Sequence, residues 1–323
     1  MRSSLRRVAA PAVLALSLFL VLAACGGQSD GSESESGGEA SVSGEIAIDG
    51  SSTVGPLSEA AQELFAAEQP DVSVTVGTSG TGGGFEAFCE GNTDISDASR
   101  PIEAEEEKIC QQNGIEYTEL TIALDALTVI AHPDVDVSCI TTEELQSIWE
   151  PAAQGKIDNW NQVNPGFPDL ELALFGPGTD SGTFDYFTDE INGEEGASRS
   201  DYEASEDDNV IVDGVSGTEG GMGYLGFTYY EENADALKAL EVDGGQGCVA
   251  PSVETAQSGD YTPLSRPLYI YVADQAYTEE PQVAAFVDFY IANLTEIVEA
   301  AQYIPLNDDQ LGETESALDS LGG

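Results

Sequence analysis

Positively charged residues are scarce in this chain. Only 9 Lys+Arg stand against 60 Asp+Glu among 323 residues, which gives a formal net charge of −51. A surface with that charge repels nucleic acid and anionic lipid headgroups, so we expect neither as a partner. Such acidity is typical of a halophilic surface, because the Debye length shrinks to about 3 Å in 1 M salt. A surface that merely keeps the protein soluble fits the same count.

Histidine is also nearly absent, since His132 is the only one. No CxxC pair occurs either, so we expect no metal site and no cofactor. Acyl transfer needs a base beside its nucleophile. His132 is the only histidine that could be this base, but it precedes a proline and is expected to be a turn residue. Asp180-Ser181-Gly182 loosely resembles the turn around a serine nucleophile, which makes an extracellular hydrolase one alternative. We nevertheless expect no enzyme activity.

The N-terminus has the composition of an export signal. Arg2, Arg6 and Arg7 precede an uncharged apolar run over 8–21, which at roughly 14 residues is too short for a comfortable transmembrane helix. Residues 1–24 are therefore expected to be a signal peptide. Its end, Leu-Ala-Ala-Cys, resembles the lipobox of bacterial lipoproteins, in which the cysteine (here Cys25) becomes the lipidated N-terminus; a simple secretory peptide is the alternative.

The segment after Cys25 is too polar to form a core. Residues 25–44 combine the lipidated cysteine with a stretch rich in glycine, serine and acidic residues, which predicts a flexible tether. Loss of the signal peptide removes three of the nine basic residues. The six that remain are Arg100, Lys108, Lys156, Arg199, Lys238 and Arg266. With only three arginines left, each one needs a physical reason.

Beyond residue 45 the chain alternates short apolar strands with amphipathic helices, the pattern of an α/β protein. Strands are expected at 45–50, 72–76, 94–98, 118–132, 170–176, 210–215, 221–230 and 265–273. Helices are expected from Pro56, over 85–91, over 103–113, after Thr141, from about 184, over 234–240 and over 281–302. Four cysteines lie in this part, namely Cys89, Cys110, Cys139 and Cys248, and an even number in an exported chain predicts two disulfides with three possible pairings.

Three turns rich in glycine and hydroxyl groups each follow a strand and lead into a helix. They are 50–56, 77–84 and 179–183. Such turns present unpaired backbone N–H groups at the positive end of a helix dipole. In an open α/β sheet they gather at the carboxyl ends of the strands, where ligands bind. Neither a P-loop nor a GxGxxG motif is present, so the turns indicate a small oxyanion rather than a nucleotide.

Four motifs make a family resemblance specific. DGSSTVGP, GTSGTGGGF, DISDASRPI and GPGTDSGTFDYF, in this order and spacing, look like the phosphate-binding protein of bacterial phosphate ABC importers, and the similarity covers about residues 45–315. It implies a type II periplasmic-binding-protein fold, with two α/β domains joined by a two-strand hinge. Domain I would comprise 45–125 plus 267–318 and domain II 126–266, with crossings near Ala123–Val129 and Pro263–Tyr269.

The resemblance also implies a function. The chain would be an extracytoplasmic lipoprotein, anchored to the bacterial cell membrane through Cys25, that captures inorganic phosphate in the interdomain cleft and delivers it to an ABC permease. Such receptors act as monomers. Within the implied domains, Cys89–Cys110 with Cys139–Cys248 is the expected disulfide pairing because it joins near neighbours. A receptor for another tetrahedral oxyanion, sulfate or molybdate, is the nearer alternative.

The ligand residues of the family carry over onto several positions. They are Thr53 with the Val54 amide, Ser79, Ser181, Gly182 and Thr183, with Ser52 and Thr81 as neighbours and Arg100 where family members present a charged residue. Better-known members carry an arginine just before the Ser-Gly-Thr turn, where this chain has Pro177 and Gly178. Arg199 is expected to supply that guanidinium, unless it pairs with Asp201 or Glu203, and Arg266 is expected to be structural.

Phosphate keeps a proton at neutral pH, whereas sulfate keeps none. A phosphate site therefore needs a carboxylate that accepts this proton and penalises sulfate. Asp49, Asp97 and Asp180 all adjoin the three turns, and the sequence does not choose among them.

Overall fold

The computed structural model describes residues 42–179 and 181–321. The expected signal peptide (1–24), Cys25 and most of the expected tether lie outside these residues, as does Asp180. No helix in the described part is both long enough and apolar enough to cross a membrane.

Nine of the described strands form one mixed sheet. They are β1 (Gly44–Gly50), β2 (Val72–Val76), β3 (Ile95–Ala98), β4 (Tyr117–Ala131), β6 (Ala173–Pro177), β7 (Glu203–Ser205), β8 (Gly221–Gly226), β9 (Lys238–Ala239) and β12 (Ser265–Ala273). Their order is β2-β1-β3-β12-β4-β8-β6-β7, with β9 also beside β4. Because β1 pairs in parallel with both β2 and β3, the carboxyl ends of these three strands meet at one edge.

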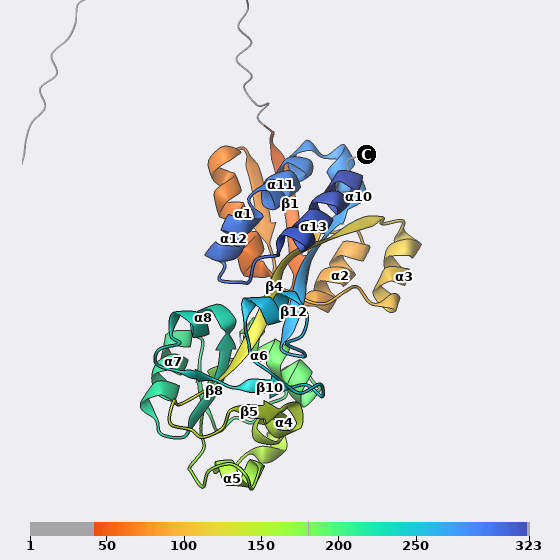
Figure 1. Cartoon of the computed structure of the whole chain (residues 1–323). Coiled ribbons are helices and arrows are strands. Elements are labelled where there is room, and N and C mark those ends of the chain that lie inside the picture. The colour runs from red at the N-terminus through yellow and green to blue at the C-terminus, as the bar shows by residue number, and fades with distance from the viewer. Residues whose placement is uncertain (1–41, 180, 322–323) are drawn as a thin grey trace, which may run out of the picture. The chain divides into compact units, whose positions relative to one another are not determined.

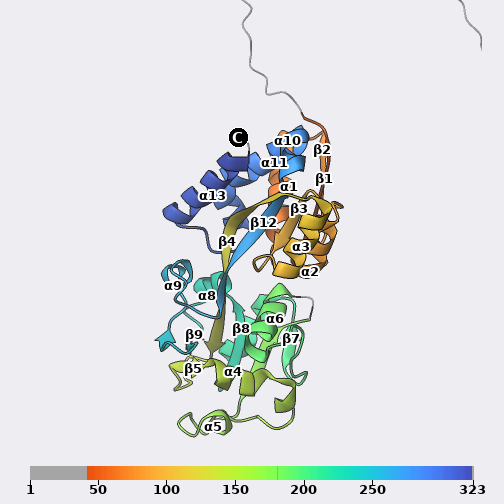
Figure 2. The same ribbon diagram turned by 90° about the vertical axis from the view of Figure 1, so that its right-hand side faces the viewer.

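The long strand β4 belongs to two halves of this sheet. Its residues 117–126 pair antiparallel with β12, and its residues 127–131 pair antiparallel with β8. We call β2-β1-β3-β12-β4 the N-terminal half-sheet and β4-β8-β6-β7 the central half-sheet. Figure 1 and Figure 2 show β4 and β12 running side by side from one group of elements to the other. The crossings expected near Ala123–Val129 and Pro263–Tyr269 fall on β4 and at the start of β12.

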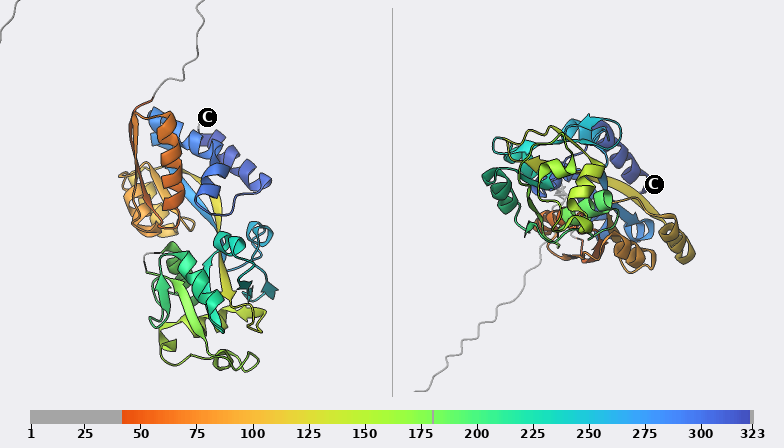
Figure 3. Two further views of the ribbon diagram at one scale, coloured as in Figure 1. Left: turned by 90° about the vertical axis from the view of Figure 1, so that its left-hand side faces the viewer. Right: turned by 90° about the horizontal axis from the view of Figure 1, so that it is seen from below.

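Helices cover each half-sheet. Around the N-terminal half-sheet lie α1 (Gly55–Glu68), α2 (Thr81–Cys89), α3 (Ala104–Asn113), α10 (Asp274–Glu279), α11 (Pro281–Ala292), α12 (Leu294–Ala300) and α13 (Asp308–Leu321). The remaining helical segments are α4 (Thr142–Trp149), η1 (Pro151–Ala153), α5 (Trp160–Val163), α6 (Gly182–Phe187), η2 (Thr188–Asn192), α7 (Asp208–Gly217), α8 (Phe227–Glu232) and α9 (Val253–Gln257). Helix α1 lies along β1 and β2, as the left view of Figure 3 shows.

Separate hydrophobic clusters lie beneath the two half-sheets. One includes Ile48, Leu57 and Phe286, and another includes Trp149, Phe187 and Tyr224. The described residues nevertheless pack as one compact unit. The division into 45–125 plus 267–318 and 126–266 therefore stays a prediction.

Four of the expected elements differ in the structure. Residues 210–215 lie in helix α7 rather than a strand, because Ile211, Val212 and Val215 share one buried face at helical spacing. Residues 234–240 form no helix; instead Lys238 and Ala239 pair with the end of β4. The strand expected over 221–230 ends at Gly226, where α8 begins, and β6 begins at Ala173, three residues later than expected.

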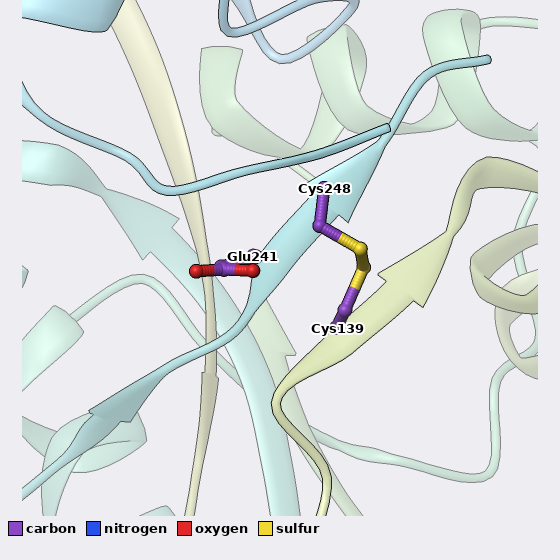
Figure 4. Close-up of side chains that lie close together, drawn as sticks. All are labelled: Cys139, Glu241 and Cys248. Atoms are coloured by element: carbon purple, nitrogen blue, oxygen red, sulfur yellow. A yellow bond between two sulfur atoms is a disulfide. The ribbon is translucent and has the colours of Figure 1, made fainter. Parts of the chain in front are cut away.

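Both disulfides form with the expected pairing. Cys89 on α2 is bonded to Cys110 on α3, and Cys139 on β5 (Cys139–Thr141) is bonded to Cys248 on β11 (Cys248–Val249). The second bond joins the outer strands of a three-stranded sheet, β11-β10-β5, in which β10 spans Glu241–Asp243. Figure 4 shows this bond with Glu241 nearby. Since both cysteine sulfurs are used in the bond, the three side chains do not offer the thiolates that a metal ion would need.

Candidate functional site

The loops that follow β1, β2 and β3 lie together at one edge of the N-terminal half-sheet. Asp49, near the end of β1, holds two of them, because its Oδ1 accepts hydrogen bonds from the Gly50 N–H at 2.9 Å and from the Ser79 N–H at 3.0 Å. The third loop joins them through Thr81, whose Oγ1 lies 3.0 Å from Ser99 Oγ. Asp49 thus fixes the shape of the loops rather than facing a ligand.

Helix α2 begins in the second of these loops. Gly80, at its N-cap, has a φ of +83°, a conformation that side chains other than glycine disfavour. A Cβ atom at Gly83 would lie 2.8 Å from Ser79 Oγ, so glycine permits the close approach of loop and helix. The first N–H groups of this nine-residue helix have no partner within the helix and are available for an anion.

These loops form one wall of a cleft of about 480 Å³. Its lining residues are Ser51, Ser52, Thr53, Ser79, Gly80, Thr81, Gly82, Gly83, Ser99, Arg100, Asp185, Tyr186, Asp189, Glu190, Glu195 and Arg266. Five residues singled out in the sequence therefore lie together here: Ser52, Thr53, Ser79, Thr81 and Arg100. The opposite wall comes from α6, η2 and the residues after them.

Arg266, at the start of β12, reaches into this cleft. Its Nη2 donates to Thr53 Oγ1 at 3.0 Å, and its Nε lies 3.4 Å from Asp125 Oδ2 on β4. Its guanidinium carbon lies 3.5 Å from the ring centre of Tyr186 on α6, a cation–π contact. Burial raises the pKa of Asp125, and the charge of Arg266 offsets only part of that rise. These contacts fit the expectation that Arg266 is structural, and Arg266 also lines the cleft.

Arg199 does not reach the cleft. Its Nε and Nη2 donate to Asp201 at 2.6 and 2.9 Å, and its Nη1 donates to the carbonyls of Ile148 and Ile157, each at 3.0 Å. The side chain is 4% exposed, and its hydrogen bonds lower the pKa of Asp201 to about 2. The expected ligand role is therefore replaced by the salt bridge that the sequence offered as the alternative.

Arg100 lines the cleft but is held by α3. Its Nη1 and Nη2 donate to the two carboxylate oxygens of Glu106 at 2.8 and 2.7 Å. Glu106 also accepts from the Glu103 N–H in the capping box that begins this helix. The same pairing raises the pKa of Arg100, so the guanidinium is charged and fixed at the rim.

The four remaining predicted ligand residues, Val54, Ser181, Gly182 and Thr183, do not line this cleft. The Val54 N–H donates to the Ser51 carbonyl at 3.2 Å, so this amide is already used. Ser181 caps α6 by accepting from the Thr183 N–H, and Gly182 lies so close to Thr53 that an added Cβ would be 2.6 Å from Thr53 Oγ1. Thr183 lines a neighbouring cavity of about 210 Å³, together with Asp125. The Ser-Gly-Thr turn thus adjoins the cleft at Thr53.

Neither described candidate for the proton acceptor lines the cleft. Asp97, on β3, is fully buried and its Oδ1 accepts from Ser58 Oγ at 2.8 Å. Burial, opposed by the Ser58 hydrogen bond, raises the pKa of Asp97 to about 8. Asp49 is occupied with the loop amides, as described above. The third candidate, Asp180, is outside the described residues.

Comparison with known proteins identifies the family. The family model of the PBP superfamily domain matches residues 35–293. The chain belongs to this superfamily. It is 51% identical to Protein SphX of Synechocystis sp. over 265 residues, covering 82% of this chain and 79% of SphX. It is 40% identical to the phosphate-binding protein PstS of Staphylococcus saprophyticus, covering 96% and 93% of the two chains.

A solved structure supports the same assignment. The crystal structure of a possible phosphate binding protein from Planctomyces limnophilus aligns with a TM-score of 0.83 and 43% identity, covering 87% of this chain and 99% of that one. The type II periplasmic-binding-protein fold expected from the sequence is confirmed.

Sequence reasoning missed several residues of this PBP cleft. Ser51, Ser99 and Tyr186 lie next to residues that the motifs identified, so proximity to a motif was the available signal. Arg266 had the stronger signal, because it is one of only three arginines after residue 24.

Proposed function

We propose that this PBP-superfamily chain captures inorganic phosphate in the cleft and delivers it to the permease of an ABC importer. One observation carries the proposal: Ser52, Thr53, Ser79 and Thr81 line the same cleft as two arginines, Arg100 and Arg266. The relatives named above as phosphate-binding proteins support phosphate as the ligand. Sulfate and molybdate are not favoured, since the names of the PstS relative and of the Planctomyces limnophilus structure point to phosphate.

Binding would use many neutral donors and few charges. Hydroxyl groups and the first N–H groups of α2 donate at hydrogen-bond range and need no net positive charge. Arg266 would hold one or two anion oxygens with its planar guanidinium, which the ring of Tyr186 and the carboxylate of Asp125 position from two sides. Arg266 would thus supply, from the crossing strand, the charge that Pro177 and Gly178 cannot supply.

We propose that no bond is broken in this site. His132, the only histidine, accepts from the Asp134 N–H at 3.2 Å, as a turn residue does, and does not line the cleft. Ser181 is used as the cap of α6. These contacts favour a receptor over the extracellular hydrolase considered from the sequence.

The two disulfides fit an oxidising, extracytoplasmic compartment. We further propose that lipid on Cys25 anchors the chain, as a monomer, to the cell membrane. A Cys25→Ser variant should then be released into the medium or periplasm, and the unmodified chain should partition with membranes. Equal partitioning of the two proteins would contradict the anchor.

Isothermal titration calorimetry tests the binding proposal. The purified protein, in concentrated KCl, is titrated with phosphate, arsenate and sulfate. We expect heat and one site per chain with phosphate and arsenate, and much weaker binding of sulfate. Absence of heat with phosphate, or equal affinity for sulfate, would overturn the proposal.

A further inference from the structure

The loop over residues 99–103 joins β3 to α3 and carries two residues of the cleft, Ser99 and Arg100. An arginine side chain has about 2 kcal/mol of rotamer entropy to lose. Its guanidinium therefore keeps one position only when both the head group and the backbone are held. Glu106 holds the head group of Arg100, as described above. The contact that holds the backbone comes from another element, the crossing strand β12.

Tyr271 on β12 anchors the backbone of this loop. Its hydroxyl oxygen accepts a hydrogen bond of 3.0 Å from the Ile102 N–H, two residues after Arg100. The same hydroxyl donates to the carboxylate of Glu119, which lies opposite Tyr271 in the register of β4 and β12. Burial and the bond to Glu119 raise the pKa of Tyr271, so the hydroxyl keeps its hydrogen. Because a hydroxyl that donates to a carboxylate is a better acceptor, the two bonds strengthen each other.

The ring of Tyr271 reaches Arg100 by a second route. It is buried and packs edge-on against Phe85 of α2, with 4.8 Å between ring centres, and against Tyr117 at 5.5 Å. The guanidinium carbon of Arg100 lies over the ring of Phe85, 5.6 Å from its centre. Since Tyr271 fixes Phe85, its ring as well as its hydroxyl limits where Arg100 can lie.

The position of β12 in the sheet explains this reach. Strand β12 lies between β3 and β4 (Figure 2), and Tyr271 pairs with Ser96, three residues before Ser99. The same strand begins with the segment that carries Arg266. One strand therefore supplies Arg266 to the cleft directly and fixes the loop that supplies Arg100.

We propose that Tyr271 is a positioning residue, which keeps Arg100 at the rim of the cleft by holding the loop 99–103. This inference rests on the proposed phosphate-binding function. Tyr271 does not line the cleft, so it acts through Arg100 rather than on the ligand. The role needs the phenol, because a phenylalanine ring can neither accept from the Ile102 N–H nor donate to Glu119.

A double-mutant cycle, measured by calorimetric titration with phosphate, tests the role. Tyr271→Phe keeps the ring but loses both hydrogen bonds, so the phosphate affinity should fall by about three- to tenfold. Arg100→Gln should lower it by about tenfold, because a charged donor is lost. In the Arg100→Gln background, Tyr271→Phe should change the affinity by less than about twofold, because the side chain that it positions is already gone. A tyrosine that only stabilises the fold would lower the melting temperature and leave the affinity unchanged.

Tyr269→Phe is the matched control. Tyr269 lies on the same strand and in the same hydrophobic cluster as Tyr271, with 6.2 Å between ring centres. It does not line the cleft, and the Ile102 N–H is bonded to Tyr271 instead. The affinity of this variant for phosphate should equal that of the unmodified protein.

Three results would overturn the role of Tyr271 while leaving phosphate binding intact. They are an unchanged affinity in Tyr271→Phe or in Arg100→Gln, an equal fall in Tyr269→Phe, and a full fall of Tyr271→Phe in the Arg100→Gln background. If the unmodified protein binds no phosphate, the proposed function itself fails. Melting curves establish that each variant is folded. If Tyr271→Phe is not, Glu119→Ala at an exposed position removes the acceptor of the hydroxyl; it should give a smaller fall that also vanishes in the Arg100→Gln background, and an unchanged affinity would again overturn the role.

Discussion

At the scale of the residue, Arg266 makes three contacts with different parts of the chain. It donates to Thr53, pairs with Asp125 and stacks on Tyr186. Arg266→Gln should therefore weaken phosphate binding by about tenfold or more, because a charged donor at the ligand is lost. Calorimetry measures the effect. Arg199→Lys is the control: it should lower the melting temperature but keep the affinity, because Arg199 does not line the cleft.

Asp97 should make folding stability depend on pH. Its pKa rises from 3.8 to about 8, chiefly through burial, so the folded state keeps a proton that the unfolded state releases near pH 4. The stability that this proton provides is complete below the unfolded pKa and is lost as pH rises to the folded one. Relative to the unmodified protein, Asp97→Asn should become progressively more stable between about pH 4 and pH 8. Thermal unfolding at several pH values measures this difference, and a constant difference would contradict it.

The residues of the cleft were predictable where local pattern decides their place. Hydroxyls next to glycine after a strand predicted that the turns would gather at one edge of the sheet, and Ser52, Thr53, Ser79 and Thr81 from two of these turns do line one cleft, because neighbouring parallel strands bring such turns together. Their role as ligands, taken from the family resemblance, stays a prediction. The ligand role predicted for Arg199 was wrong. Its partner Asp201 is only two positions away, and the guanidinium pairs with that carboxylate rather than with an anion in the cleft. The contact between Ser52 and Asp185 spans 133 positions and depends on how two half-sheets meet, which no local pattern encodes.

At the scale of the element, the two disulfides close loops of very different length. Cys139–Cys248 spans 109 positions and Cys89–Cys110 spans 21. Because a longer loop has more entropy to lose in the unfolded chain, replacing the first pair by serine should cost about 5 kcal/mol of unfolding free energy and replacing the second about 3 kcal/mol. Denaturant unfolding under oxidising conditions measures both. The reverse order would show that native contacts dominate over chain entropy.

Helices with clear start and stop signals were predicted well, whereas short apolar runs were not. The capping box of Thr141 and Glu144 and the helix end at Gly114, with a φ of 74°, form as expected. Residues 210–215 read equally well as strand or helix, and the Asp207 cap together with packing on β8 selects the helix. Residues 234–240 have the composition of a helix. Lys238 and Ala239 instead form the short strand β9, which pairs antiparallel with the end of β4.

At the scale of the whole molecule, the net charge of −51 makes stability depend on salt. Repulsion among the carboxylates weakens as the Debye length falls from about 10 Å at 0.1 M to about 3 Å at 1 M. The melting temperature should therefore rise with KCl concentration over this range. Equal ionic strengths of NaCl and KCl separate screening, which treats the two salts alike, from specific cation binding. A melting temperature independent of salt would mean that the acidic surface serves solubility alone.

The order of strands also governs how the chain is built during synthesis. Strand β12 lies between β3 and β4, although it is made more than 130 residues after β4 ends at Ala131. Until Ser265–Ala273 emerges from the ribosome, β3 and β4 lack the neighbour that each has in the finished sheet. In the central half-sheet the corresponding strand is β8, which lies between β4 and β6 and is made some forty residues before β12. We therefore expect the middle of the chain to fold before its beginning, so the loops that begin the cleft are completed last.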